Sequence, residues 1–230
     1  MKDVVSNSVY FGVAVSLAAF IIGVQLNKKL KLSILNPLLV SIVIIVTILL
    51  VFDIDYESYN NGGKYISYFL TPATVCLAIP LYQQLDLLKK NFKAIMIGIL
   101  TGVLTSLTSI LALSAIFKLS HGMYVTLLPK SITTAIGIAV SEELGGMETI
   151  TVAAIVLTGI VGSVLGEGIC KLFKIKNPIS IGLSLGTASH AIGTSRALEL
   201  GEVHGAMSSL SIAVSGLLTV VLAPAFSNLL

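Results

Sequence analysis

The chain has 230 residues, of which 55% are apolar and only 11% are charged, and its formal net charge is +3. A soluble domain carries roughly twice that charged fraction, so a water-exposed surface is excluded for most of the chain. The positive charge comes from short lysine clusters and not from one basic face, and we expect no nucleic-acid partner. Cys76 and Cys170 lie far apart in apolar stretches, so we expect no disulfide and no metal site, and we expect no cofactor.

Apolar runs long enough to cross a bilayer follow one another along the chain. A bilayer core requires about 20 apolar residues per helix. Six runs meet this requirement, namely Val9–Leu26, Leu32–Phe52, Tyr65–Leu85, Ala94–Phe117, Thr149–Leu172 and the stretch from Gly205 to the C-terminus. Pro72 and Pro80 fall inside the third run and are expected to kink that helix. We therefore expect an all-α, polytopic transmembrane helical bundle, with residues 1–230 forming a single integral membrane domain.

Lysine clusters indicate how these spans are oriented. Lysines gather at 28–31, 89–93 and 171–176, and cytoplasmic loops are enriched in Lys and Arg. All three clusters are therefore expected inside and the N-terminus outside. The fourth helix then ends outside, and the helix Thr149–Leu172 has to start outside in order to end inside. The segment Tyr124–Gly146 between them begins and ends on one side, which indicates a re-entrant hairpin or two half-spans.

Two apolar segments, Tyr124–Gly146 and Ile179–Glu202, are interrupted by Ser, Thr and Gly and resemble each other. The sequences TTAIGIAVSEELG from Thr133 and SHAIGTSRALELG from Ser189 share six of thirteen positions at an offset of 56 residues. Together with the lysine pattern, this indicates inverted repeats, a recurring transporter design with discontinuous helices. The alternative is that both segments are ordinary glycine-containing helices that resemble each other by ancestry alone. The repeat units are expected to comprise approximately residues 124–173 and 179–230.

Polar residues of the two segments are candidates for an anion site, because non-helical backbone at membrane depth is tolerated only where it is buried in protein or lines water. Lys130 and Arg196 would suit a small carboxylate, Arg196 through a bidentate pair and Lys130 as a point charge. The alternative is that Lys130 extends to the outer surface while Arg196 pairs with Glu199 or Glu202. The candidate substrate-binding residues are Lys130, Ser131, Thr133, Thr134, Gly137, Ser189, His190, Gly193, Thr194, Ser195 and Arg196.

Three of the segments' residues are candidates for ion coupling. His190 could carry a proton near neutral pH, although a structural histidine bonded to backbone in the break fits the sequence equally well. Glu143 and Glu199 end the broken segments and could take protons or cations, although solvated caps and salt-bridge partners fit as well. The sequence places no nucleophile with a base and an orienting partner, so we do not expect an enzyme.

Pairs of glycines four residues apart occur at three places in the apolar runs. Such pairs allow two helices to approach closely. Within one polytopic chain we expect them to serve internal packing and not dimerisation, and a homo-oligomer stays open. The pairs are Gly98/Gly102, Gly162/Gly166 and Gly182/Gly186.

Three stretches carry a resemblance to a known family: TPATVCLAIPLYQQLD, LLPKSITTAIGIAVSEELGG and GTASHAIGTSRALELGEVHGAMSSLSI. The chain resembles the LrgB/CidB family of bacterial membrane proteins over essentially its whole length. The resemblance implies one role that is holin- or antiholin-like, in which murein hydrolase activity and cell lysis are modulated with a smaller LrgA/CidA-type partner. It also implies transport of small carboxylates such as pyruvate, glycolate and glycerate, with which relatives, including a chloroplast envelope protein, are linked.

The sequence therefore predicts a transporter of small organic anions, similar to pyruvate or glycolate, in the inner membrane of a bacterial cell. We expect it to contact the lipid bilayer, to act with an LrgA-type partner and to influence autolysis. The alternative is an antiholin- or holin-like regulator of murein hydrolase activity and cell lysis, which would not need paired polar breaks. A purely structural partner of an LrgA-like subunit is a third reading.

Overall fold

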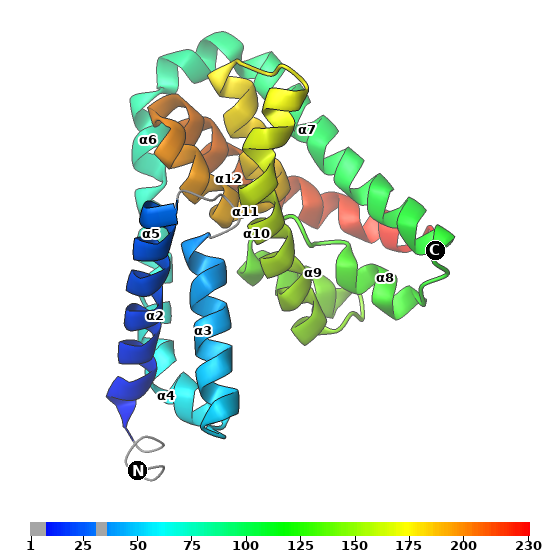
Figure 1. Cartoon of the computed structure of the whole chain (residues 1–230). Coiled ribbons are helices and arrows are strands. Elements are labelled where there is room, and N and C mark those ends of the chain that lie inside the picture. The colour runs from blue at the N-terminus through cyan, green and yellow to red at the C-terminus, as the bar shows by residue number, and fades with distance from the viewer. Residues whose placement is uncertain (1–7, 31–35) are drawn as a thin grey trace. The chain divides into compact units, whose positions relative to one another are not determined.

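The computed structural model describes residues 8–30 and 36–230, which form helices joined by short turns (Figure 1). The chain divides into two compact units, one ending at Cys76 and one running from Leu77 to Leu230. The expected all-α class is confirmed for the described residues. The helices are α2 (Val9–Leu30), α3 (Pro37–Val51), α4 (Tyr56–Ser67), α5 (Leu70–Cys76), α6 (Ala78–Gln83), α7 (Leu85–Ile116), α8 (His121–Leu127), α9 (Thr134–Glu143), α10 (Glu148–Leu172), α11 (Pro178–Leu200) and α12 (Glu202–Ser227).

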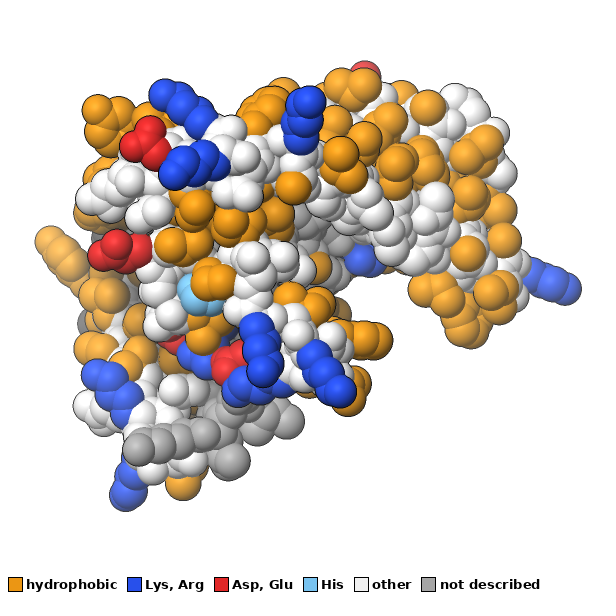
Figure 2. All heavy atoms as spheres, turned by 90° about the horizontal axis from the view of Figure 1, so that it is seen from above, with side chains coloured by type: hydrophobic (Ala, Val, Ile, Leu, Met, Phe, Trp, Pro, Cys, Tyr) orange, Lys and Arg blue, Asp and Glu red, His pale blue; other side chains and the backbone are white. Residues whose placement is uncertain are grey.

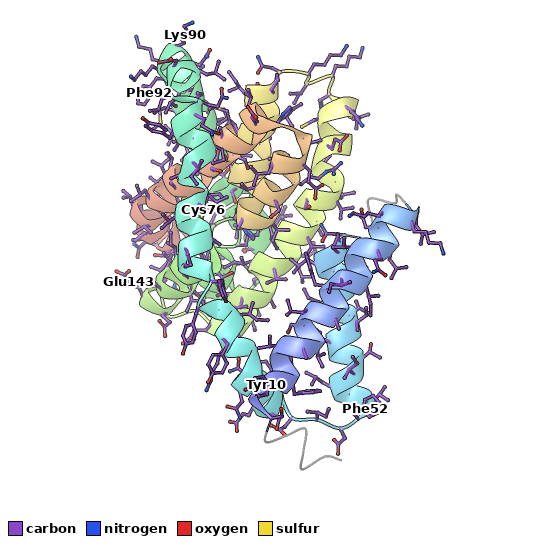
Figure 3. All side chains as sticks on the ribbon, turned by 90° about the vertical axis from the view of Figure 1, so that its left-hand side faces the viewer. Tyr10, Phe52, Cys76, Lys90, Phe92 and Glu143 are labelled. Carbon is purple, nitrogen blue, oxygen red and sulfur yellow. The ribbon has the colours of Figure 1, made fainter. Side chains whose placement is uncertain are left out.

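In the first unit, α2 and α3 pack side by side and run in opposite directions. Tyr10 near the start of α2 and Phe52 after the end of α3 therefore lie at the same end of this unit (Figure 3). Ser16 on α2 hydrogen-bonds the Tyr59 hydroxyl of α4 at 2.7 Å, which fixes α4 against α2. The two helices correspond to the first two expected spans, although residues 31–35 of the second lie outside the described residues.

The third expected span, Tyr65–Leu85, is divided into short helices, and Tyr68 and Leu77 between them keep helical φ/ψ angles. The structure has the end of α4 followed by the two short helices α5 and α6. Pro72 and Pro80 each occupy the third position of their helix. Proline is tolerated in the first turn, where its missing N–H would have no intrahelical acceptor. Each proline therefore lies in the first turn of a short helix, at the interruptions that the sequence predicted for this span.

The second unit contains the remaining expected spans as α7, α10 and α12. Together with α2, these are the four helices among the described residues that are long and apolar enough to cross a membrane, and α3 is a shorter apolar helix. Leu165 on α10 and Leu217 and Val221 on α12 are 52%, 69% and 71% exposed, and hydrophobic side chains spread over much of the face seen in Figure 2. So large an exposed apolar surface indicates lipid as its solvent. The chain is a multi-pass membrane protein.

All three glycine pairs lie at contacts between α11 and another helix of the second unit. The expectation of internal packing is therefore confirmed. Gly98 and Gly102 of α7 face side chains of α11, and Gly162 and Gly166 of α10 face others. The pair on α11 itself meets α12, where Gly186 lies against the backbone and side chain of Ser208. Because a Cβ atom would collide at most of these positions, the glycines bring α7, α10 and α12 close around α11.

Two backbone turns of the same kind are separated by the 56 residues that separate the similar sequences, and a third such turn follows α3 at Asp53 (φ 50°). Lys118 and Lys174 follow α7 and α10 and have positive φ angles of 52° and 57°. Beyond them, the N–H groups of Leu119 and Ile175 donate to carbonyls five residues back, at 2.9 and 2.8 Å. This bond defines a Schellman turn. The turns at Lys118 and Lys174 precede the two similar sequences that start at Thr133 and Ser189.

The two similar sequences, which start at Thr133 and Ser189, each end at a glycine with positive φ, 79° at Gly145 and 147° at Gly201. A long helix follows in both cases, α10 after the first copy and α12 after the second. The two segments thus share the order of turn, broken segment, glycine and long helix. The repeat units, their inverted relation in the membrane and an N-terminus outside stay predictions.

Candidate functional site

The first broken segment consists of α8, a non-helical stretch over residues 128–133, and α9. A buried hydroxyl cluster closes its far end. Thr151 on α10 hydrogen-bonds Ser141 Oγ on α9 at 2.6 Å and donates to the carbonyl of Thr126 on α8 at 3.0 Å. The two short helices are thereby fixed to the start of α10, and the stretch between them is presented to the interior of the unit. The expected break in Tyr124–Gly146 is confirmed.

The second break is confined to one residue of α11. His190 adopts φ 41° and ψ −134°, outside the helical region, between two helical halves. Its Nε2 lies 3.0 Å from the carbonyl oxygen of Ile155 on α10, and its ring lies against Gly159. Thr194 donates to the carbonyl of His190 at 3.0 Å. His190 therefore makes the backbone bond that one of the two interpretations of the sequence expected, and proton coupling stays a prediction.

A cavity of about 870 Å³ lies between α7, the stretch after Pro129, α10 and α11. Both broken segments contribute to it, the first through Lys130 and Ser131 and the second through Ser189. Among the described residues that line it, Lys130 is the only charged one. The hydroxyl-bearing side chains that line it are Thr101, Thr105, Ser106, Ser109, Ser131, Thr158, Ser180, Ser184, Thr187 and Ser189.

Lys130 is half-buried at the wall of this cavity. Its Nζ donates to Ser131 Oγ at 3.1 Å, and Ser131 Oγ lies 3.1 Å from Ser106 Oγ on α7. No carboxylate of residues 8–30 and 36–230 lies within ion-pair distance of Nζ. A partly desolvated ammonium without a counter-ion is costly. The site is therefore one that a small anion would stabilise.

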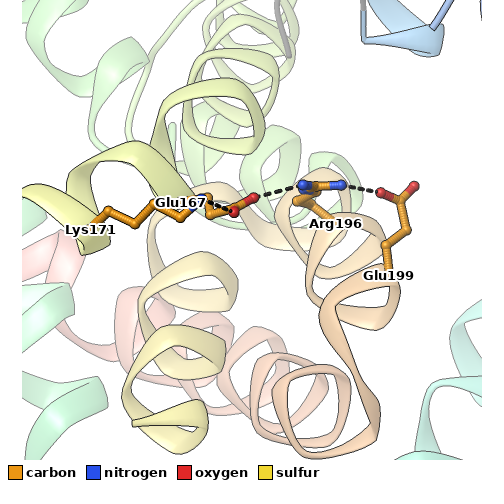
Figure 4. Close-up of polar contacts among 4 residues, drawn as sticks. All are labelled: Glu167, Lys171, Arg196 and Glu199. Carbon is orange, nitrogen blue, oxygen red and sulfur yellow. Dashed lines mark hydrogen bonds and ion pairs between the residues drawn. The ribbon is translucent and has the colours of Figure 1, made fainter. Parts of the chain in front are cut away.

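Arg196 does not share this cavity, which corrects the expectation that it and Lys130 hold one carboxylate together. Its Nη2 lies 2.6 Å from Glu167 on α10 and its Nη1 lies 2.6 Å from Glu199 (Figure 4). Glu167 also pairs with Lys171 at 2.7 Å. Both terminal guanidinium nitrogens already face carboxylates, so the arginine bridges α10 and the second half of α11. The alternative pairing with Glu199 is the one observed.

The remaining candidates are spread around the breaks. Apart from Lys130, Ser131 and Ser189, none of the proposed substrate-binding residues lines the large cavity. Gly137 packs against Ile155, and Ser195 is exposed. Glu143 is exposed at the end of α9, away from Lys90 at the opposite end of this unit (Figure 3). The candidates away from the cavity are Thr133, Thr134, Gly137, His190, Gly193, Thr194, Ser195 and Arg196.

Sequence reasoning missed the contribution of α7. Thr101, Thr105 and Ser109 recur every four residues, which places them on one face of a helix, and all three line the cavity. Their hydroxyls donate to backbone carbonyls of α7 at 2.7 to 2.8 Å. That spacing of hydroxyl residues in an otherwise apolar span was the available signal. It went unused because α7 carries no break and no charge in that region.

Comparison with known proteins gives a consistent match over the whole length. The sequence model of the LrgB-like family matches residues 16–229. A protein of Bacillus subtilis (strain 168) named antiholin-like protein LrgB is 42% identical over 224 residues, which cover 97% of each chain. A protein of the same name from Bacillus mycoides (strain KBAB4) is 41% identical over 94% of this chain and 95% of its own. No solved structure matches.

Proposed function

Because this chain belongs to the LrgB-like family, we propose that it is an antiholin-like regulator of cell lysis whose molecular activity is the transport of a small organic anion. The name of its relatives supports the first part of this proposal. The cavity supports the second part. Control of murein hydrolases would then follow from the movement of the anion, or of the charge that it carries, across the membrane.

One observation carries the anion site: Lys130 presents an ammonium to a large cavity whose described lining holds no other charge. An ionisable residue at membrane depth marks a functional site by default. A single cation balances a single negative charge, and the surrounding hydroxyls can hydrogen-bond additional oxygens. The substrates that fit best are monocarboxylates similar to pyruvate or glycolate.

The setting of this activity follows the family. We place the chain in the inner membrane of a bacterial cell, with its N-terminus outside, and with an LrgA-type small membrane protein as partner. The lysine clusters support the orientation. The partner would be needed either for transport itself or for the link between transport and lysis.

Uptake into proteoliposomes tests the transport activity. Vesicles that contain the purified chain, with and without its LrgA-type partner, are given labelled pyruvate, glycolate or a neutral sugar of similar size. We expect saturable uptake of the carboxylates and none of the sugar. Release of unrelated solutes of graded size would instead indicate a pore, and absence of any uptake with the partner present would remove the transport proposal.

The family name favours a second test that needs no transport. Cells that lack the chain are expected to lyse faster under murein-hydrolase stress, and the intact chain restores normal lysis. If a variant that no longer takes up carboxylates still restores lysis control, the antiholin-like role is independent of anion transport. The two parts of the proposal can therefore fail separately.

A further inference from the structure

A second and much smaller cavity lies beside the large one, deeper in the second unit. Its volume is about 10 Å³, and α7, the stretch after Leu128, α11 and α12 enclose it. Its apolar wall comes from side chains of Val103, Leu107, Leu128 and Ile132. The hydroxyls that line it belong to Ser106, Ser131, Thr187, Ser215 and Thr219. Three of these residues, Ser106, Ser131 and Thr187, line the large cavity as well.

Thr187 gives the small cavity its chemical significance. The side chain is only 7% exposed, and its Oγ1 has no hydrogen-bond partner among the described residues. A buried hydroxyl without a partner costs free energy, because it has given up its bonds to water. Native structures rarely leave such a group unsatisfied. The position of Thr187 on the wall of a cavity therefore indicates that something polar occupies the cavity.

The number of hydroxyl protons beside the small cavity also indicates a polar occupant. Lys130 can only donate, so Ser131 Oγ accepts from it. Ser131 and Ser106 then share one hydrogen bond at 3.1 Å, which uses one of their two hydroxyl protons. The described chain offers the other proton no further acceptor. Both serines line the two cavities, and a polar occupant of the small one would supply the missing acceptor.

We propose that one buried water molecule occupies the small cavity and completes a chain of hydroxyls that holds the Lys130 ammonium at the wall of the large cavity. The volume corresponds to about one water, and a buried water requires two to four polar partners. The water accepts the spare proton of the Ser106–Ser131 pair and bonds Thr187. A cation is disfavoured there, because the ammonium of Lys130 lies one hydroxyl away.

This arrangement makes Thr219 on α12 a positioning residue. Thr219 and Ser215 line the small cavity but not the large one. As further partners of the proposed water they act through it on Ser131, and Ser131 in turn holds Lys130. The positioning role of Thr219 rests on the proposed anion site, whereas the water itself does not.

Removal of single hydroxyls from the ligand-free protein tests the water. Thr187→Val deletes Oγ1 at nearly constant volume. If the water is present, this change removes one of its partners, and we expect the Tm to fall by about 2–4 °C. Ser114→Ala is the matched control, because Ser114 Oγ is also buried without a partner among the described residues but lines neither cavity. There we expect an unchanged or higher Tm, since a deleted unsatisfied group removes a cost.

A Thr187→Val protein that responds in the same way as Ser114→Ala would overturn the water site. Density in a high-resolution structure provides a second measurement that does not depend on folding of the variant. A peak within hydrogen-bond distance of Thr187 Oγ1 supports the proposal, and an empty cavity rejects it.

Binding of labelled pyruvate tests the positioning step. Thr219→Val is expected to weaken binding several-fold although it touches no part of the large cavity, and Thr219→Ser, which keeps the hydroxyl, is expected to restore it. Equal binding by both variants would remove the positioning role while leaving the water in place. If no variant and no wild-type protein binds pyruvate, the anion site fails and the Tm comparison still decides the water.

Discussion

The two broken segments are similar in sequence, yet they open the backbone differently. In the first, residues 128–133 leave the helix altogether and place Lys130 on the wall of the large cavity. In the second, only His190 departs from helical geometry, and the helix continues to Arg196, which pairs with two glutamates. The first segment therefore holds an unpaired cation and the second a paired one, and the two cations do not match at the 56-residue offset, where Lys130 corresponds to Gly186 and Arg196 to Val140.

This difference shows that two segments of similar sequence need not carry the same chemistry. A long break turns side chains inward, because several residues escape the helical register. After a break of one residue the helix continues, so Arg196 lies on the second half of α11, where its side chain reaches Glu167 of α10. We therefore expect substitutions in the two broken segments to have separable effects on binding and on stability.

The largest separation is expected between the two cations. Lys130→Gln removes the charge at the cavity, and a hydrogen bond to a charged group contributes about 1.5–3 kcal/mol, which corresponds to a loss of roughly 10- to 150-fold in anion affinity. Equilibrium binding of labelled pyruvate measures it. Lys90→Gln, an exposed lysine at the start of α7, is the control and leaves binding unchanged. Equal affinities for both variants would remove Lys130 from the site.

The terminal glycines give the next largest effect. Gly201 has φ 147° and ψ 169°, a region that is nearly restricted to glycine, so Gly201→Ala is expected to cost about 1–3 kcal/mol of the free energy of unfolding. Gly145 has φ 79°, and nothing lies within contact of an added Cβ there. Gly145→Ala should therefore cost less, about 1–2 kcal/mol. Denaturant titration in detergent compares them, and the reverse order would contradict the assigned geometry.

At His190 we expect the usual difference in stability between an alanine and a glycine substitution to change sign. Alanine normally stabilises a helix over glycine by about 0.5–1 kcal/mol. At His190 the positive φ reverses that order, since glycine adopts this conformation without strain. His190→Gly is therefore expected to unfold at a higher temperature than His190→Ala, although both lose the bond to Ile155. The matched pair Thr134→Gly and Thr134→Ala, in the first turn of α9, should show the ordinary order.

The smallest effect is expected at Arg196. Its side chain is 34% exposed, and partly exposed ion pairs contribute about 0–1 kcal/mol. Arg196→Gln should lower the Tm slightly and leave pyruvate binding unchanged. A double-mutant cycle that combines Arg196→Gln with Glu167→Gln should give a coupling energy that accounts for most of this loss of stability. A large loss of binding in Arg196→Gln would restore this residue to the anion site.

The sequence predicted most of the fold because membrane depth imposes simple requirements on it. Runs of about 20 apolar residues located α2, α7, α10 and α12 among the described helices, and the Ser, Thr and Gly content located both breaks. In the third span, Pro72 and Pro80 were expected to kink one helix, and each lies in the first turn of a separate short helix. Periodicity cannot distinguish a kink from a helix start, since proline suits both.

The candidate site was predicted less well, because partners from other helices decide it. Lys130 and Arg196 looked equivalent in sequence, and only the position of Glu167, 29 residues before Arg196, separates them. Thr187 gave no signal, since a hydroxyl in an apolar run is common and its lack of a partner appears only in three dimensions. Side-chain roles of this kind depend on packing across helices, which an internal repeat does not encode.

The charge of the large cavity has an electrical consequence. With Lys130 as the only charged residue among those described on its wall, the empty cavity carries one positive charge, and a bound monocarboxylate cancels it. A potential of 100 mV exerts about 2.3 kcal/mol on one elementary charge that crosses the whole membrane. In the proposed transport cycle the voltage therefore acts on the return of the unloaded protein, while the loaded protein crosses as a neutral body. The energised state of the cell would then set how fast the carrier resets, and collapse of that voltage would alter anion flux without any change in the anion itself.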